Sequence, residues 1–394
     1  GRAPGGAARG AAARGVARAG RCGAGGGWGG GGHMRVVAKI GTSSITDEHG
    51  TVDERAIAKF CGDVAGLRAA GHQVVAVTSG AIAAGLPSLA FPERPKDAVT
   101  LQAASAIGQS RLMRVYDGAF AQHGLVAGQL LLAPLDFIVR QQYLHARATL
   151  ERLLELGVVP VVNENDAIAD DEIRFGDNDR LSALVAHLLG ADLLILLTDT
   201  PGLLTADPRL DQTASLIEEI VEVDQEIEAL AGSSGSGRGS GGMASKVTAA
   251  KIAAWSGVRA VIADARRVGV MAGAVAGDAV GTVVQPRDKR LASRKLWIAF
   301  AVGSAGTVVV DAGARRALVD ANRSLLPAGI VEVKGTFHAE DAVEVAGPDG
   351  EVFAKGLVRV DAGVLAGAAG KQTVDLPEGM PHEVIHRDDL VVLP

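Results

Sequence analysis

The sequence predicts an α/β protein in which a mainly parallel sheet is sandwiched between helices, followed by a small β-rich domain. Six short apolar runs lack polar alternation, which is typical of strands that are buried on both faces. Longer segments with helical periodicity separate these runs, and this alternation favours a parallel sheet with helices on both sides. After about residue 304 the pattern changes to short segments with closely spaced turns, which predicts a second domain.

The strands predicted for the first domain are residues 35–40, 73–78, 124–132, 158–163, 193–198 and 258–263. The helices predicted between them are residues 52–70, 97–123, 141–156, 178–189 and 242–256. The strands predicted for the second domain are residues 307–311, 330–333, 342–345, 351–360 and 384–393, with a strong turn at 347–350. We therefore expect folded domains over residues 34–290 and 304–394, preceded by a disordered extension over residues 1–33.

The N-terminal extension is rich in Gly, Ala and Arg, contains no acidic residue, and cannot bury enough apolar surface to offset the entropy of ordering. It lacks the continuous apolar stretch of a signal peptide. We expect translated upstream sequence or a cloning remnant before Met34, with an organelle transit sequence as the alternative. Its five arginines contribute +5 to the formal charge of −6, so the rest of the chain carries −11. That sign argues against a general nucleic-acid binder.

Length and composition set broad limits on the class of protein. The chain has 394 residues, of which 48% are hydrophobic, so it can bury a large core in two domains. No run of about 18 apolar residues is present, so we expect no membrane-spanning segment. The two cysteines, Cys22 and Cys61, cannot form a disulfide framework, and a reducing, cytoplasmic setting is expected.

Polar clusters directly follow four of the predicted strands, at residues 39–44, 78–80, 163–166 and 198–199. Open α/β sheets bind ligands at the carboxyl ends of their strands, so we expect these clusters to form one site. Capping and turn roles explain some of these residues, such as the Ser and Gly of 78–80. They do not explain why four strands end in the same way.

Two lysines indicate phosphate chemistry. The stretch from Arg238 to Lys246 leads glycines into an alanine-rich helix, and backbone N–H groups at such a helix start suit an anion. The alternative is that residues 232–242 are a flexible linker. Lys39 closes an apolar strand, although a surface lysine with a buried stem is the alternative there. Together, the two side chains could converge on one phosphoryl group, which predicts a phosphotransferase.

Amides and carboxylates are concentrated at 163–166 and 176–179, around a predicted hairpin at 168–175. Turn and capping duties account for some of them, notably just before the helix that begins near Asn178. Carboxylates suit an ammonium group and Asn side chains can donate to a carboxylate, so the pattern indicates an amino-acid substrate.

Taken together, these segments resemble the glutamate 5-kinases within the amino acid kinase family, over essentially everything from Met34 onward. The resemblance rests on VAKIGTSS (37–44), VTSGAIAAG (77–85), AIGQSRL (106–112), VNEND (162–166), FGDNDxLSA (175–183), LTDxxGLLTADPR (197–209) and GSGGMASK (239–246). Residues 324–330 and 386–389 are similar to the PUA domain that many bacterial members carry. Ser240 stands where the family usually has Thr, and Leu204 where it often has Tyr.

The resemblance implies ATP-dependent phosphorylation of the L-glutamate side-chain carboxylate to γ-glutamyl 5-phosphate, the first step of proline biosynthesis, with ATP as co-substrate and Mg²⁺. It implies catalytic roles for Lys39, Lys246 and Asp179. The ATP-binding positions that it implies are Lys39, Thr198, Asp199, Ser240, Gly241, Gly242, Met243, Ala244, Ser245 and Lys246. The substrate-binding positions are Ser79, Asn163, Asp166 and Asn178. No protein ligand of the metal is assigned.

The expected chemistry agrees with the residue types. A side-chain carboxylate with a pKa of about 4.3 is ionised at neutral pH, so the reaction needs no general base. The resemblance also implies a homo-oligomer and feedback binding of L-proline. Another acceptor, such as aspartate, N-acetylglutamate or a nucleoside monophosphate, is the rival interpretation. The composition of residues 304–394 disfavours RNA binding, since this region contains 8 Lys and Arg residues and 14 Asp and Glu residues.

Overall fold

The computed structural model describes most of the chain from residue 32 onward. The described residues are 32–47, 51–89, 91, 95–133, 135–168, 178–208, 211–233, 242–288, 290–300, 302–377 and 379–393. Residues 1–31 of the extension that was predicted to be disordered over 1–33, and most of the hairpin predicted at 168–175, therefore lie outside them. No helix among these residues is both long and apolar enough to cross a membrane.

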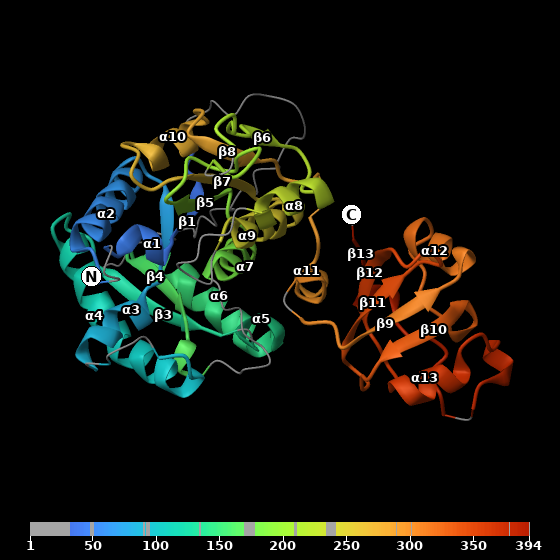
Figure 1. Cartoon of the computed structure of the whole chain (residues 1–394). Coiled ribbons are helices and arrows are strands. Elements are labelled where there is room, and N and C mark those ends of the chain that lie inside the picture. The colour runs from blue at the N-terminus through green and yellow to red at the C-terminus, as the bar shows by residue number, and fades with distance from the viewer. Residues whose placement is uncertain are drawn as a thin grey trace, which may run out of the picture. The chain divides into compact units, whose positions relative to one another are not determined.

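The first domain is built on an eight-stranded sheet with the order β3-β4-β2-β1-β5-β7-β8-β6 (Figure 1). Its strands are β1 (Arg35–Ile40), β2 (Gln73–Val77), β3 (Ala127–Leu132), β4 (Val159–Glu164), β5 (Leu193–Thr198), β6 (Glu219–Ile220), β7 (Arg259–Asp264) and β8 (Gly281–Val284). All neighbours are parallel except β7 and β8. The predicted parallel α/β sheet is thereby confirmed.

Helices cover both faces of this sheet (Figure 1). They are α1 (Thr42–Ile45), α2 (Glu54–Ala69), α3 (Ala81–Gly85), α4 (Ala98–Ala121), α5 (Leu135–Ile138), α6 (Arg140–Glu155), α7 (Asn178–Leu189), α8 (Gln225–Ser233), α9 (Met243–Trp255) and α10 (Val270–Ala276), with 3-10 turns η1 (Leu86–Ser88) and η2 (Asp166–Ile168). Asp53 and Asp97 cap α2 and α4 by accepting hydrogen bonds from backbone N–H groups, which is why those helices begin there.

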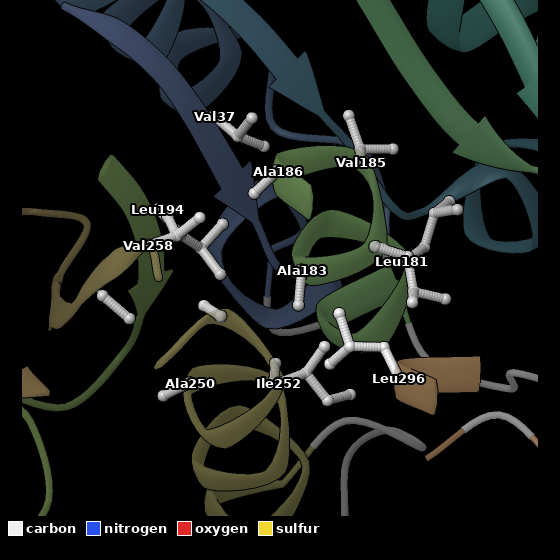
Figure 2. Close-up of a cluster of buried hydrophobic side chains, with 14 of the residues drawn as sticks. Val37, Leu181, Ala183, Val185, Ala186, Leu194, Ala250, Ile252, Val258 and Leu296 are labelled. Carbon is white, nitrogen blue, oxygen red and sulfur yellow. The ribbon is translucent and has the colours of Figure 1, made fainter. Parts of the chain in front are cut away.

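The alternation of side chains along β1 decides which way Lys39 faces. Val36 and Ala38 pack into a core with α2, α4 and α10, whereas Val37 packs into the core with α7 and α9. Figure 2 shows the core that contains Val37, in which Val37 and Leu194 lie near α7 and α9. Because strand side chains alternate, Lys39 shares the face of Val37 and points toward α7 and α9.

The C-terminal region forms a separate five-stranded sheet with the order β10-β9-β11-β12-β13. Its strands are β9 (Gly306–Val310), β10 (Ile330–Gly335), β11 (Ala342–Ala346), β12 (Val352–Leu357) and β13 (Leu390–Val392). The predicted strand at 384–393 is mostly wrong, because only its last residues pair with β12, while Ile385 makes an isolated bridge to Leu325. Helices α11 (Ser293–Phe300), α12 (Ala312–Val319) and α13 (Ala362–Ala368) and turns η3 (Pro327–Gly329), η4 (Thr373–Asp375) and η5 (Arg387–Asp389) complete the described elements after residue 290.

Helices α3 and α4 approach each other through glycine. A Cβ atom added to Gly85 would lie 1.8 Å from the carbonyl oxygen of Ala104, and one added to Gly108 would lie 1.8 Å from that of Ala81. The two backbones are therefore in direct contact. Since α3 follows the end of β2 by only three residues, this contact also fixes the loop that carries Ser79.

Gly108→Ala should destabilise the chain by about 1–3 kcal/mol, because α3 or α4 must move to admit the methyl group. Gly118→Ala is the matched control: it lies on the same helix with nothing within 4 Å of the new Cβ. It should stabilise the chain by about 0.5–1 kcal/mol, through helix propensity alone. Urea unfolding curves measure both, and equal effects of the two substitutions would contradict the close contact.

Candidate active site

The site centres on the carboxylate of Asp179, in the first turn of α7. The Nζ atom of Lys39, near the end of β1, lies 2.5 Å from its Oδ1 atom. The Nζ atom of Lys246, in the first turns of α9, lies 3.1 Å from its Oδ2 atom, to which the hydroxyl of Ser245 also donates at 2.7 Å. The two lysines are 3% and 4% exposed and Asp179 is fully buried. Side chains from three distant parts of the sequence thus meet on one carboxylate.

The electrostatics of this cluster favour an anionic ligand. Burial alone would raise the pKa of Asp179, but the charges of Lys39 and Lys246, with hydrogen bonds from Lys39 and Ser245, hold that pKa below its usual range. Asp179 is therefore ionised at neutral pH. One carboxylate faces two ammonium groups, so these three side chains carry an excess of one positive charge in a setting where water screens it poorly.

The N-terminus of α9 adds backbone donors beside the lysines. Gly242 is the N-cap residue, with an extended backbone, and no side chain among the described residues caps the helix. The first-turn N–H groups and the helix dipole make such an end favourable for phosphate oxygens. Gly242, Met243, Ala244 and Ser245 are placed here as predicted, while Ser240 and Gly241 lie outside the described residues.

A hydrogen-bonded group of amides lies at the end of β4. Asn163 donates through Nδ2 to Oε1 of Gln109 on α4 at 2.8 Å. The backbone N–H of Glu164 donates both to Oδ1 of Asn163 and to Oδ1 of Asn178, each at 3.0 Å. Asn178 begins α7, so this group is joined to Asp179 by one peptide bond. Asp166 in η2 accepts a 2.7 Å hydrogen bond from the hydroxyl of Ser105.

The sheet register sets these groups in a row. Ser79 follows β2, and the N–H of the residue before it donates to the carbonyl of Val162 in β4 at 2.9 Å. Lys39 is paired with Val77 of β2 and Leu196 of β5. Thr198 ends β5, and its hydroxyl donates to the carboxylate of the neighbouring exposed Asp199 at 3.2 Å. Along the carboxyl edge, the order is therefore Asn163, Ser79, Lys39, Thr198.

Two polar residues of this site were not among the predicted binding residues, Ser105 and Gln109. They lie four residues apart, and so on one face of α4, where each holds a predicted substrate residue. Gln109 is 8% exposed, and its Nε2 atom is buried with no hydrogen-bond partner in the described part of the chain. Gln109 lies in the AIGQSRL segment and Ser105 directly precedes it, but the sequence alone does not show which face of α4 meets β4 and η2.

No resident metal site is visible in the part of the chain that the structure describes. Among those residues, no three His, Cys, Asp or Glu side chains come together in a group that could hold an ion. The charged cluster that is present, with two lysines on one carboxylate, suits an anion.

Comparison with known proteins identifies the family to which the chain belongs. The amino acid kinase family matches residues 34–264, and the PUA domain matches residues 306–380. The chain belongs to the amino acid kinase family, and it carries a C-terminal PUA domain.

Several curated relatives of the chain are glutamate 5-kinases. That of Pelobacter propionicus is 46% identical over 363 residues, which cover 91% of this chain and 97% of the relative. That of Trichlorobacter lovleyi is 45% identical, with 91% and 96% covered. That of Burkholderia orbicola is 44% identical, with 91% and 98% covered. The resemblance drawn from the motifs is confirmed, whereas the role of each individual residue stays a prediction.

Asp179→Asn should lower the free energy of unfolding by about 3–5 kcal/mol, because it leaves two buried ammonium groups without their shared counter-charge. Asp63→Asn is the control, since Asp63 pairs with Lys59 at the surface and should contribute less than about 1 kcal/mol. Chemical denaturation of both variants measures the difference. A loss below 1 kcal/mol in Asp179→Asn would mean that Asp179 does not hold the lysines.

Proposed function

We propose that this chain transfers the γ-phosphoryl group of ATP to the side-chain carboxylate of L-glutamate and so forms γ-glutamyl 5-phosphate, the first step of proline biosynthesis. One observation carries the proposal: Lys39 and Lys246 meet on Asp179, between an amide-rich strand end on one side and Thr198 on the other. Kinship with glutamate 5-kinases supports the choice of substrate.

We infer that ATP binds on the α9 and β5 side of the lysine pair. The N–H groups of residues 242–245 and the two ammonium groups bind its phosphates, and Thr198 and Asp199 lie at the neighbouring strand end. Lys39 and Lys246 stabilise the charge that spreads over the transferring phosphoryl oxygens. Asp179 positions both ammonium groups before ATP arrives, so little reorganisation is needed during the reaction.

Mg²⁺ fits this site as a companion of the nucleotide. It would enter with ATP and would supply additional positive charge to the phosphoryl group. Mg²⁺ usually keeps several waters and is held mainly by phosphates, so the site needs no carboxylate cage of the protein's own.

We infer that glutamate binds on the β4 and β2 side of the lysine pair. Because Asn178 accepts with Oδ1, its Nδ2 group is the end that can donate to a substrate carboxylate. Asp166 is held by Ser105 and offers a carboxylate to the substrate ammonium. Ser79 and then Asn163 follow Lys39 along the same edge, both on this side of it. The bound side-chain carboxylate is already ionised and attacks phosphorus once it is aligned.

The remaining expectations concern feedback regulation, cellular location, assembly and the C-terminal domain. L-proline resembles the substrate at its amino and carboxylate groups, and we place its feedback binding at the glutamate site. The enzyme acts in the cytoplasm as a homo-oligomer. Residues 304–394 carry a net charge of −6, from 8 basic and 14 acidic residues, which disfavours an RNA-binding role.

The decisive measurement is the trapping of the acyl phosphate with hydroxylamine. Glutamate should give ATP-dependent hydroxamate, and aspartate, N-acetylglutamate and UMP should not support comparable ADP release. Proline should reduce the rate. Turnover with one of the other acceptors above that with glutamate would overturn the assignment.

Lys39→Ala and Lys246→Ala should each lower kcat by about 10²-fold or more, because each removes a charge aimed at the transferring phosphoryl group. Lys251→Ala is the control, because Lys251 lies on the same helix as Lys246 but outside the site, where it pairs with Glu228 at 2.8 Å. It should retain the rate. Thermal unfolding of all three checks that they fold, and full turnover in folded Lys39→Ala and Lys246→Ala would remove the mechanism.

Gln109 acts as a positioning residue for the glutamate site. Gln109→Met removes the acceptor of Asn163 Nδ2 and should raise KM for glutamate by about 10-fold, the effect of one unsatisfied buried polar group. KM for ATP should not change. Gln109→Glu keeps an acceptor oxygen and should restore part of the affinity, and Ser110→Ala, exposed on the same helix, is the control. Equal changes in both KM values would indicate a general structural role.

A further inference from the structure

A polar surface cavity lies at the end of α7 that is away from Asp179. It has a volume of about 490 Å³ and is lined by side chains of α6, the last residues of α7 and the segment that enters α11. A helix of 12 residues spans about 18 Å, so the two ends of α7 are well separated. The carbonyl of Leu189, at the end of α7, accepts a hydrogen bond from Arg35, the first residue of β1. The cavity therefore lies at the amino edge of the sheet, opposite the candidate active site.

A chain of hydrogen bonds runs along the cavity wall. The hydroxyl of Ser293 lies 2.8 Å from Nε2 of His187 and 3.3 Å from the hydroxyl of Tyr143. His187 is only 4% exposed, and its Nδ1 atom is buried without a hydrogen-bond partner in the described part of the chain. Three elements thus contribute polar groups to one wall.

Two guanidinium groups give the cavity its charge. Arg147 lies one helical turn after Tyr143 on α6, and Arg290 precedes α11; both line the cavity. Arg290 donates to the carbonyl of His187 at 2.8 Å, and Arg147 pairs through Nε with Glu151 at 2.9 Å. Each guanidinium retains further N–H donors beyond these bonds.

Both arginines act on the same imidazole. Burial first, and then the charges of Arg290 and Arg147, lower the pKa of His187 to about 4. His187 is therefore neutral at physiological pH, and the arginines supply the positive charge of the cavity. The carboxylate of Glu151 accompanies Arg147, so an acidic side chain balances one of the two charges.

A capping role explains only part of this arrangement. Cations at a helix C-terminus bond its last carbonyls, and Arg290 does so on α7. That role uses one N–H group of Arg290. It gives no reason for Arg147, which comes from another helix, or for the hydroxyl pair of Ser293 and Tyr143 on the same wall.

We propose that this cavity binds a small molecule through its phosphate group, held by Arg147 and Arg290 with the hydroxyls of Ser293 and Tyr143. Arginine forks and hydroxyl donors from different elements suit the oxygens of a tetrahedral anion, which do not lie in one plane. The volume lies within the usual range of about 300–1,000 Å³ for ligand sites, so it admits more than the phosphate group alone. Of the three leucines that line the cavity, Leu188 and Leu189 are buried in the core, and the half-buried Leu291 offers apolar surface to the rest of the ligand.

Calorimetric titration of the full chain with inorganic phosphate tests the site, at constant ionic strength and with the candidate active site saturated by a non-hydrolysable ATP analogue, Mg²⁺ and glutamate. Phosphate should bind with one site per chain. Arg147→Gln and Arg290→Gln should each weaken binding at least 10-fold, and Ser293→Ala should weaken it less. Arg140→Gln is the control, since Arg140 lies on the same helix outside the cavity and is exposed.

Because the candidate active site is saturated in this experiment, phosphate cannot bind at Lys39 and Lys246, and any binding that is measured comes from elsewhere. A titration with acetate under the same conditions tests whether the site prefers phosphate to a planar carboxylate. If acetate binds as tightly as phosphate, the assignment of the ligand is overturned. The site itself is overturned if phosphate does not bind, or if it binds both arginine variants as tightly as the unchanged chain. Unfolding curves of each variant verify that the exposed substitutions leave the fold intact.

Discussion

The rest of the site depends on one buried ionic contact, in which Asp179 holds the ammonium groups of Lys39 and Lys246. Each partner comes from a different element, and none of the three could be buried alone without a large desolvation cost. The carboxylate therefore ties β1, α7 and α9 together at the point where the phosphoryl group is expected. The same contact presents two cations in a fixed geometry, which is what an electrostatic mechanism requires.

The strand order of the sheet places different polar groups on the two sides of that contact. β1 lies between β2 and β5, so the amide-rich ends of β4 and β2 fall on one side of Lys39 and Thr198 on the other. An acceptor and a donor that approach from opposite sides of the lysines are set for an in-line transfer. The alternation of side chains along β1, which turns Lys39 toward α7 and α9, completes this arrangement.

Much of the fold was predictable because its signals are local. Residues 35–40 and 193–198 are apolar runs buried on both faces, and β1 and β5 have those bounds; the helix at 178–189 was equally clear. The expected strand at 384–393 failed because pairing with β12, rather than composition, decides where β13 begins. The convergence of Lys39 and Lys246 could be anticipated from their places at a strand end and a helix start. The contact of Asn163 with Gln109 could not, because it depends on how α4 packs beside β4.

The glycine contact between α3 and α4 limits how this half of the enzyme can respond to its substrates. Backbones that touch without intervening side chains cannot slide past each other, so α3, α4 and the loop holding Ser79 form a rigid unit. Ser105 and Gln109 belong to that unit as well. Any closure over the amino acid must therefore move α3, α4 and the Ser79 loop together.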